Sequence, residues 1–274
     1  MEKLQAAKTG DKPALYPDLK KYIGTRYDFV GLSVPRQRQV FKTGFGHDHL
    51  TLQEQLKIWD FCWRHSNLYE VLSQALLFIS HHLEKPDQLN HRLLWKTTRG
   101  WVGRIDNWAH SDSLSAIYSY LLEKDLEVSF TAARTSTRPK APAYKLTKRR
   151  AGERQSPVNP SPVYKQLKTW NLSANPWERR QSVVSLLEYD KKRKTVLPAA
   201  ELLSMVEPLL GDEDYFVQKG VGWTLREIGN RYPGACWQFL LDHVTDIRPA
   251  AFTAAIEKLD PAKKERLKKL RKKR

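Results

Sequence analysis

A tryptophan and a carboxylate lie one helical turn apart in the segment Asp106-Asn107-Trp108-Ala109-His110-Ser111-Asp112. Trp108 and Asp112 are four residues apart, so on a helix their side chains lie on the same face. An indole ring attracts cations and a carboxylate neutralises them, so the pair can stabilise positive charge. A core tryptophan beside a solvent-exposed aspartate has the same spacing, and this segment alone leaves both interpretations open.

A second tryptophan, Trp223, lies in a predicted helix at 214–231 but outside its apolar stripe. That stripe consists of Val217, Val221, Leu225 and Ile228. Trp223 is therefore predicted to face a cleft, with packing against a neighbouring helix as the alternative. Gly220 and Gly222 weaken the same helix, so they require a packing reason, such as the close approach of another helix or a ligand.

Two arginines occupy the first turn of a further predicted helix, at 177–189. Arg179 and Arg180 follow Asn175-Pro176-Trp177, and the helix dipole disfavours cations at that end. Positive charge there is explained by an anion that docks at the helix N-terminus, and a phosphate group is the obvious candidate. Acidic partners from a neighbouring helix are the alternative explanation.

The elements that position these residues are all predicted to be helices. The first block is expected at 14–23, 35–43, 52–65, 69–83, 89–105 and 107–122, and the second at 177–189, 199–210, 214–231, 233–244 and 249–259. Thr51 followed by Glu54 predicts a capping box before the helix at 52–65. Paired helices that recur every 35 to 45 residues or so are typical of HEAT-type solenoids. We therefore expect an all-α, curved, HEAT-like helical-repeat solenoid.

One HEAT-like domain is expected over 1–259, made of N-terminal helices at 1–125, a basic insertion at 126–161 and C-terminal helices at 162–259. The insertion is rich in proline and contains Lys148, Arg149 and Arg150. A loop, or a DNA-contacting segment with a short hairpin through 144–146, fits its composition. The basic tail at 260–274 is expected to extend the last helix when it binds an anion, adding affinity through counterion release.

The overall charge points to a polyanionic partner. The chain has 47 Lys and Arg against 30 Asp and Glu, a net charge of +17, and DNA, RNA and anionic lipid all satisfy such a charge. No apolar run reaches the roughly 18 to 20 residues of a spanning helix, so we expect a cytoplasmic protein without a membrane partner. We also expect it to be a monomer. Cys62 and Cys236 lie in apolar stretches, and no histidine spacing predicts a metal site.

Four motifs, in the same order, carry a family resemblance. They are Tyr22 with Tyr27-Asp28-Phe29-Val30-Gly31-Leu32 and Val34-Pro35-Arg36-Gln37-Arg38, then Asn107-Trp108 with Asp112, then Trp177-Glu178-Arg179-Arg180, and finally Phe216-Val217-Gln218-Lys219 with Gly222-Trp223-Thr224-Leu225-Arg226-Glu227. With them the chain resembles the AlkD-like DNA alkylation-repair glycosylases, a branch of the HEAT-like helical proteins. It departs from their pattern in its longer insertion and in His110-Ser111, which interrupts a typically more apolar stretch.

The resemblance implies a DNA glycosylase that excises cationic N3- or N7-alkylated purines from double-stranded DNA without a cofactor and leaves an abasic site. It implies that Trp108, Asp112 and Trp223 form the active cleft, that Tyr22 lines it and that Arg180 binds phosphate. We expect further DNA contacts from Arg38, Arg179, Lys219, Lys148, Arg149 and Arg150, and a location at the bacterial nucleoid.

Two other functions stay open at this point. Some relatives with an inserted hairpin resemble non-catalytic binders of bent or branched DNA, and the basic insertion and tail of this chain fit that role as well. A helical-repeat scaffold for protein or RNA is the more distant alternative. It would be favoured if Trp108, Asp112 and Trp223 were scattered over separate buried sites.

Overall fold

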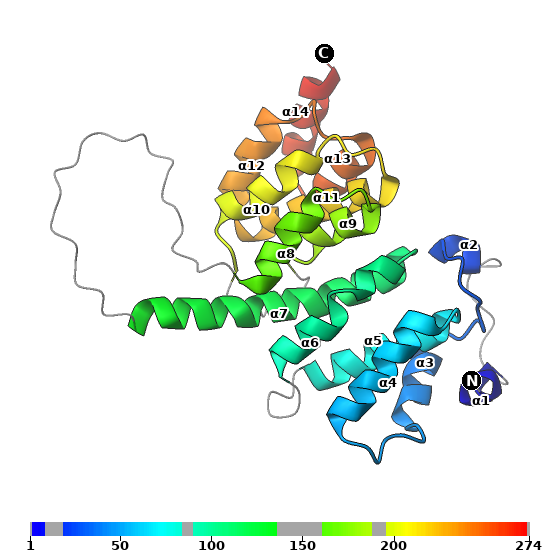
Figure 1. Ribbon diagram of the computed structural model, residues 1–274. Helices are drawn as coiled ribbons and strands as arrows, with labels where there is room; N and C mark the ends of the chain where they lie inside the picture. The colour runs from blue at the N-terminus through cyan, green and yellow to red at the C-terminus, as the bar shows by residue number, and fades with distance from the viewer. Residues whose placement is uncertain (1, 9–18, 84–89, 136–160, 188–195, 273–274) are drawn as a thin grey trace.

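The regular secondary structure is helical in the residues that the computed structural model describes, which are 2–8, 19–83, 90–135, 161–187 and 196–272, with backbone alone for 129–135. One long helix, α7 (Trp108–Thr135), runs between an N-terminal and a C-terminal group of helices (Figure 1). The described residues contain a single isolated β-bridge, between Asp28 and Leu68. The predicted all-α solenoid class is thereby confirmed.

The N-terminal group follows the sequence prediction closely where helix caps are strong. It comprises α1 (Glu2–Lys8), α2 (Leu19–Ile23), α3 (Val34–Lys42), α4 (Leu52–His65), α5 (Tyr69–Leu83) and α6 (His91–Thr98). Both hydrogen bonds of the Thr51/Glu54 capping box are present and fix the start of α4. Of the helix expected at 14–23, only the end falls within the described residues.

The single helix expected at 89–105 was a wrong prediction. α6 ends at Thr98, and a short 3₁₀ helix, η1 (Trp101–Arg104), follows it. The break turns Trp101 into the core, where its ring stacks on Trp63 with 4.6 Å between centroids. Its Nε1 donates a 2.7 Å hydrogen bond to Asp60 Oδ1. A continuous helix would give up this stacking and the partner of a buried indole nitrogen.

α7 extends further than predicted. Its expected end was residue 122, but it continues to Thr135, through residues assigned to the basic insertion. Asp125 on α7 accepts a 2.8 Å hydrogen bond from Ser161 Oγ and thereby joins α7 to the start of the next helix. Residues 136–160, with Lys148, Arg149, Arg150 and the possible hairpin, lie outside the described residues.

The C-terminal group has two rows of helices. One row consists of α8 (Pro162–Asn171), α10 (Ala199–Val206), which ends in the 3₁₀ turn η2 (Glu207–Leu209), and α12 (Pro233–Asp242). The other consists of α9 (Pro176–Val184), α11 (Tyr215–Arg231) and α13 (Pro249–Ala255), with α11 packed between its two neighbours. The first row starts at Pro162, Ala199 and Pro233, intervals close to the expected HEAT repeat length.

The close helix approach predicted from the glycines of α11 is present. A Cβ on Gly222 would lie 2.2 Å from the backbone oxygen of Ala251, and one on Gly220 would lie 3.2 Å from Cγ of Arg180. Glycine therefore allows α13 to pack directly on α11 and Arg180 to lie across it.

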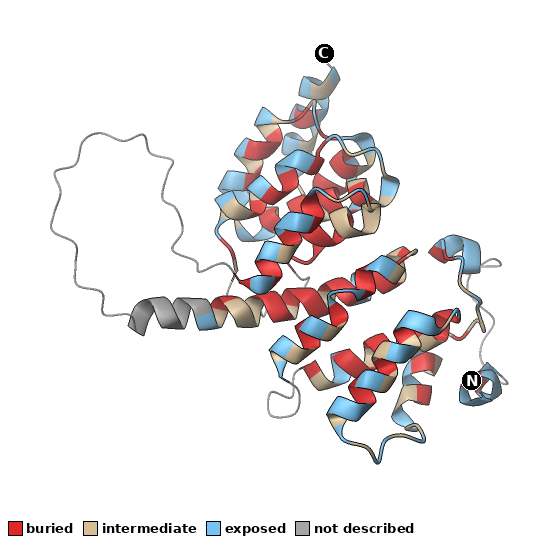
Figure 2. Ribbon diagram, viewed as in Figure 1, coloured by how far each residue is buried: buried red, intermediate tan, exposed pale blue. Residues whose placement is uncertain are grey.

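One continuous core joins the two groups of helices. A single cluster of buried apolar side chains extends from Leu56 in α4 to Leu267 in the last helix, and buried residues line the facing sides of the helices (Figure 2). A smaller cluster around Leu4, Leu32 and Val40 attaches α1 to α3. None of the described helices is long and apolar enough to cross a membrane.

The tail does not extend the last predicted helix. α13 ends at Ala255, and a separate helix, α14 (Pro261–Lys272), begins after a turn. Pro261 suits the first turn of a new helix and cannot continue the preceding one. Leu267 of α14 is completely buried, so this helix is part of the folded body.

Candidate active site

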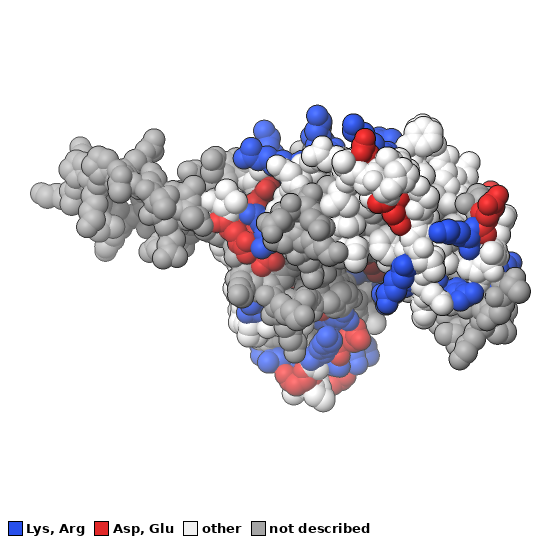
Figure 3. Space-filling view, turned by 90° about the horizontal axis from the view of Figure 1, so that it is seen from below, with Lys and Arg blue, Asp and Glu red and all other residues white. Residues whose placement is uncertain are grey.

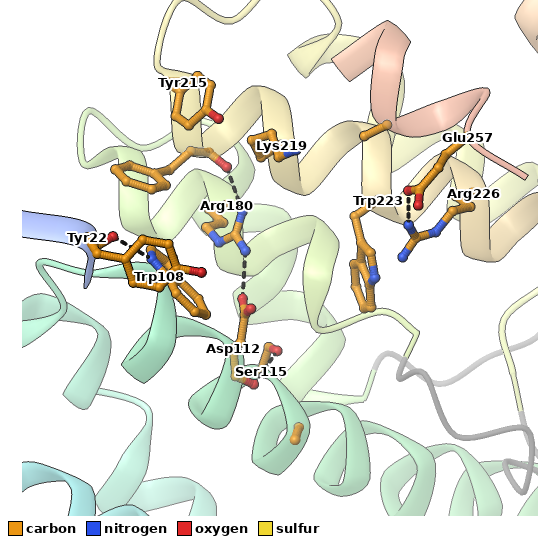
Figure 4. Close-up of a pocket in the computed structure, with 13 residues that line it drawn as sticks. Tyr22, Trp108, Asp112, Ser115, Arg180, Tyr215, Lys219, Trp223, Arg226 and Glu257 are labelled. Carbon is orange, nitrogen blue, oxygen red and sulfur yellow. Dashed lines mark hydrogen bonds and ion pairs between the residues drawn. The ribbon is translucent and has the colours of Figure 1, made fainter. Parts of the chain in front are cut away.

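The structure brings Trp108, Asp112 and Trp223 to a single pocket of about 780 Å³ (Figure 4). Its walls come from α2, α7, α9, α11 and the end of α13, so segments more than 200 residues apart in sequence meet there. The other lining residues are Tyr22, Ser115, Ala116, Arg180, Tyr215, Phe216, Lys219, Arg226, Ala254 and Glu257. Trp108, Asp112 and Trp223 therefore do not lie in separate buried sites, the arrangement that would have favoured a helical-repeat scaffold.

Asp112 forms a close ion pair with Arg180 and still remains accessible. Arg180 Nη2 lies 2.6 Å from Asp112 Oδ1, and the two side chains are 8% and 49% exposed, respectively. The arginine is thus buried behind the carboxylate, and the carboxylate faces the pocket (Figure 4). Because half of the Asp112 side chain is open to solvent, the ion pair leaves it within reach of a ligand.

Arg180 holds three helices together at the back of the pocket. Its Nε donates to Ser111 Oγ at 3.1 Å, and its Nη1 donates to the backbone oxygen of Phe216 at 2.6 Å. Gln181, also buried, donates to Ser111 Oγ at 3.0 Å and so keeps that hydroxyl in place. Both ends of the guanidinium are therefore fixed, which fixes the carboxylate of Asp112 in turn.

Arg179 does not reach the pocket. It forms a bidentate pair with Asp212, at 2.6 and 3.2 Å, and donates to the backbone oxygens of Ser173 and Ala174. The hydrogen bond that Arg179 donates to Asp212 raises the pKa of Arg179 further above its usual value. The acidic partner Asp212 explains why an arginine lies in the first turn of this helix, which was the alternative explanation given by the sequence. We therefore assign Arg179 a structural role.

Tyr22 and Trp108 form one wall of the pocket together. Their rings meet edge to face with 5.7 Å between centroids, and Trp108 Nε1 donates a 3.3 Å hydrogen bond to the backbone oxygen of Tyr22. Tyr22 is 48% exposed although it is aromatic. An aromatic ring that remains half open at the edge of a pocket is available for a ligand.

Two carboxylates anchor the segment that presents Tyr22. Asp106 accepts hydrogen bonds from Thr25 Oγ1 at 2.9 Å and from the backbone nitrogen of Arg26 at 2.8 Å. The completely buried Glu70 accepts from the backbone nitrogens of Val30, Gly31 and Leu32 at 2.7 to 3.2 Å. Gly31 has a φ of 88°, which a residue with a Cβ rarely adopts. The motif at 27–32 therefore fixes the path of the chain behind Tyr22.

His110 and Ser111, the residues that depart from the family pattern, point away from the pocket into the core. Asn107 donates to His110 Nδ1 at 3.1 Å, Ser73 Oγ lies 3.0 Å from its Nε2, and its ring stacks on Tyr69 at 4.2 Å. Burial lowers the pKa of His110 to about 3, so the imidazole is neutral. Both polar residues are satisfied within the core and leave the pocket face of α7 to Trp108 and Asp112.

Some residues that line the pocket were not predicted as site residues, among them Tyr215, Arg226 and Glu257. Tyr215, Lys219, Trp223 and Arg226 follow one another at spacings of four, four and three on α11, which places them on one helical face. That spacing was a usable signal for Tyr215 and Arg226. Glu257 pairs with Arg226 in the wall of the pocket; it comes from the segment after α13 and has no such signal.

Arg38 lies elsewhere, exposed on α3, in a groove together with Phe41 and Trp59. Lys148, Arg149 and Arg150 are outside the described residues, so their part in DNA contact stays a prediction. Among the described residues, no group of three or more His, Cys, Asp or Glu side chains is arranged to hold a metal ion. Viewed from below, basic side chains are spread along the edges of the molecule with acidic ones among them (Figure 3).

The sequence matches the protein family described as DNA alkylation repair enzyme over residues 2–136 and 159–259. This is most of the chain, and the protein therefore belongs to that family, as its four motifs predicted. Its fold is similar to that of a predicted DNA alkylation repair enzyme from Enterococcus faecalis, with a TM-score of 0.64 and 14% identity over 92% of this chain and 97% of that one. No curated protein matches the sequence.

Proposed function

We propose that the protein is a monofunctional DNA glycosylase that removes cationic N3- or N7-alkylated purines from duplex DNA. The observation that carries the proposal is the position of Asp112, a half-exposed carboxylate, in one pocket with the indoles of Trp108 and Trp223. Carboxylate and ring faces both stabilise positive charge. The exposed side chain of Lys219, which lines the same pocket, fits a phosphate backbone.

The chemistry of the substrate sets what the protein must supply. A purine alkylated at N3 or N7 is already cationic, so when the C1′–N bond breaks its electron pair neutralises the base, which leaves without a general acid. The deoxyribose becomes oxocarbenium-like, and water adds to C1′ and releases its extra proton to solvent, which leaves the neutral hemiacetal of the abasic site. Asp112 stabilises the positive sugar and positions the water. Electrostatic help of this kind contributes roughly 3 to 4 kcal/mol in comparable preorganised sites.

Arg180 makes Asp112 a fixed group. A carboxylate that has to reorient during the reaction loses part of its stabilising effect, whereas one held by a buried guanidinium does not. The 2.6 Å contact between Arg180 Nη2 and Asp112 Oδ1, backed by Ser111 and Phe216, provides that rigidity. Trp108 and Trp223 then contact the sugar and backbone of the damaged nucleotide, so the base can stay stacked in the duplex.

The test is release of free base from duplex DNA that contains 7-methylguanine. Under single-turnover conditions the wild type releases the base, and Asp112→Asn slows release by about 10²- to 10³-fold, the equivalent of the electrostatic contribution above. Asp242→Asn is the matched control, because Asp242 is an exposed aspartate of α12 outside the pocket. Equal rates for wild type and Asp112→Asn would remove the carboxylate from the mechanism.

The same assay separates the alternative function. A non-catalytic binder of bent or branched DNA would bind junctions more tightly than linear duplex and release no base from either. That alternative depends chiefly on the basic insertion, most of which lies outside the described residues. No contact in the pocket favours a non-catalytic binder over an enzyme that excises bases.

A further inference from the structure

α14 is an unusually basic helix that is folded firmly onto the C-terminal end of the molecule. Seven of its residues are Lys or Arg and one, Glu265, is acidic. Leu267 is completely buried, and Arg271 donates to the backbone oxygens of Val244 at 2.9 Å and Ile247 at 2.6 Å. The guanidinium of Arg271 also lies 4.7 Å from the ring centroid of Phe252. This helix is held in place by specific contacts, so the backbone positions that carry its lysines are fixed relative to the rest of the protein.

α14 begins at the edge of the pocket. Lys264 Nζ donates a 2.7 Å hydrogen bond to the backbone oxygen of Glu257, which lines the pocket. Lys263 and Arg266 lie over the ring of Trp237 on α12, at 5.6 and 5.7 Å from its centroid. With a rise of 1.5 Å per residue, the twelve residues of the helix span about 18 Å from that edge.

The side of α14 away from Leu267 carries exposed lysines. At 100° per residue, Lys268, Lys269 and Lys272 fall on that side, and all three are exposed. Lys268 pairs with Glu265 at 2.9 Å within the helix. The buried Leu267 is used in docking, which leaves no broad apolar face of the kind an interfacial membrane helix needs.

We propose that α14 is a second contact surface for duplex DNA, which binds the phosphate backbone beside the damaged nucleotide through Lys268, Lys269 and Lys272. The inference rests on the proposed function in taking DNA as the ligand, and it adds a surface outside the pocket. The charge of these lysines fits a phosphate backbone, and α14 begins at the edge of the pocket that the proposed function assigns to duplex DNA, so duplex DNA is the ligand that we assign to them. A prearranged row of lysines binds phosphate at a lower entropic cost than a flexible tail does.

The expected effect follows from counterion release. Each phosphate neutralised in duplex DNA contributes about 0.9 to the slope of log affinity against log salt, which corresponds to up to about eightfold in affinity at 0.1 M salt. The triple variant Lys268→Gln, Lys269→Gln, Lys272→Gln should therefore bind undamaged duplex at least about tenfold more weakly. Its salt slope should be smaller by about 2 to 3.

A matched triple variant with the same change in net charge is available at exposed positions of α4 and α6. It combines Lys57→Gln, Arg92→Gln and Lys96→Gln. Affinity for a 30-base-pair duplex would be measured from 50 to 300 mM salt for the wild type and both variants, with circular dichroism to show that the fold is retained. An equal loss in both variants, or an unchanged slope in the α14 variant, would overturn the proposal.

Other polyanions provide the remaining arms of the experiment. If the α14 variant loses binding to vesicles with anionic phospholipid or to single-stranded RNA but not to duplex DNA, the assignment of DNA is refuted. Base release by the wild type is measured separately. If the α14 variant binds duplex DNA more weakly but the wild type releases no base, the proposed catalysis is refuted and the contact surface is supported. If the wild type releases base but the α14 variant binds duplex DNA as tightly as the wild type, the contact surface is refuted and the proposed catalysis is supported.

Discussion

Gly222 lies where α13 leaves no room for a side chain on α11. In Gly222→Ala the new Cβ would lie 2.2 Å from the backbone oxygen of Ala251 and 2.8 Å from Cβ of Ala254. Carbon and oxygen atoms pack at about 3.5 Å, so the backbone of α13 has to move by about 1 Å. A backbone oxygen cannot rotate out of the way as a long side chain can.

The stability change can be worked from two opposing effects. Overpacking costs about 1 to 3 kcal/mol, and a clash with backbone belongs at the upper end. Replacing glycine by alanine in a helix returns about 1 kcal/mol. We therefore expect Gly222→Ala to lower the free energy of unfolding by about 2 kcal/mol. Base release should fall as well, because Ala254 on the displaced helix lines the pocket.

Gly229→Ala is the matched control on the same helix. A Cβ at Gly229 would lie 3.5 Å from Cys236 Sγ, an ordinary contact, so this variant keeps or gains up to about 1 kcal/mol. Denaturant unfolding followed by circular dichroism measures both variants. If the two free energies of unfolding differ by less than about 1 kcal/mol, the packing argument for Gly222 is refuted.

Three further predictions concern other parts of the site. Asp106→Asn replaces one of the two oxygens that accept from Thr25 Oγ1 and the backbone nitrogen of Arg26 with an amide NH2, which cannot accept. Base release should therefore fall and aromatic near-ultraviolet dichroism should change while the unfolding midpoint moves little; an unchanged rate would contradict this anchoring role. Burial lowers the pKa of His110 from 6.5 to about 3, so below pH 6.5 the unfolded chain binds a proton that the folded protein excludes. The free energy of unfolding should therefore fall by up to about 1.4 kcal/mol per pH unit as the pH drops from 6.5 towards 3, and this loss should be absent in His110→Gln. Finally, Lys219 lies at the pocket but is given no covalent role, so borohydride should trap no protein–DNA adduct during base release; a trapped adduct that disappears in Lys219→Gln would show a bifunctional enzyme instead.

Local signals in the sequence located most of the helices. The helices at 52–65 and 69–83 were predicted at their observed bounds, because a capping box and a clear apolar period mark them. The break before Trp101 was missed since its cause is tertiary, a ring that stacks on Trp63 from another helix. The end of α7 was misplaced because the basic, proline-rich composition that begins further on was taken to start at residue 126.

Site residues could be predicted where a local motif marks them. They could not be predicted where their role depends on a side-chain partner from another part of the chain. Trp108 and Asp112 share a helix face and Trp223 lies off an apolar stripe, so local spacing marked all three as candidates, and the family resemblance assigned them to one cleft. The dipole argument treated Arg179 and Arg180 alike. Their different environments depend on Asp212 and Asp112, which belong to other elements and leave no trace in the local sequence. Arg226 could have been found from the face that it shares with Trp223.

The most direct test of the proposed function compares two duplexes that differ in one methyl group. The wild-type protein is incubated in excess with duplex DNA that carries 7-methylguanine or guanine at one position, and free base and alkali-labile abasic sites are both quantified. Excision of a cationic base predicts equal amounts of free 7-methylguanine and abasic sites from the first duplex and neither product from the second. Stable binding of both duplexes with the methylated base left in place would contradict it.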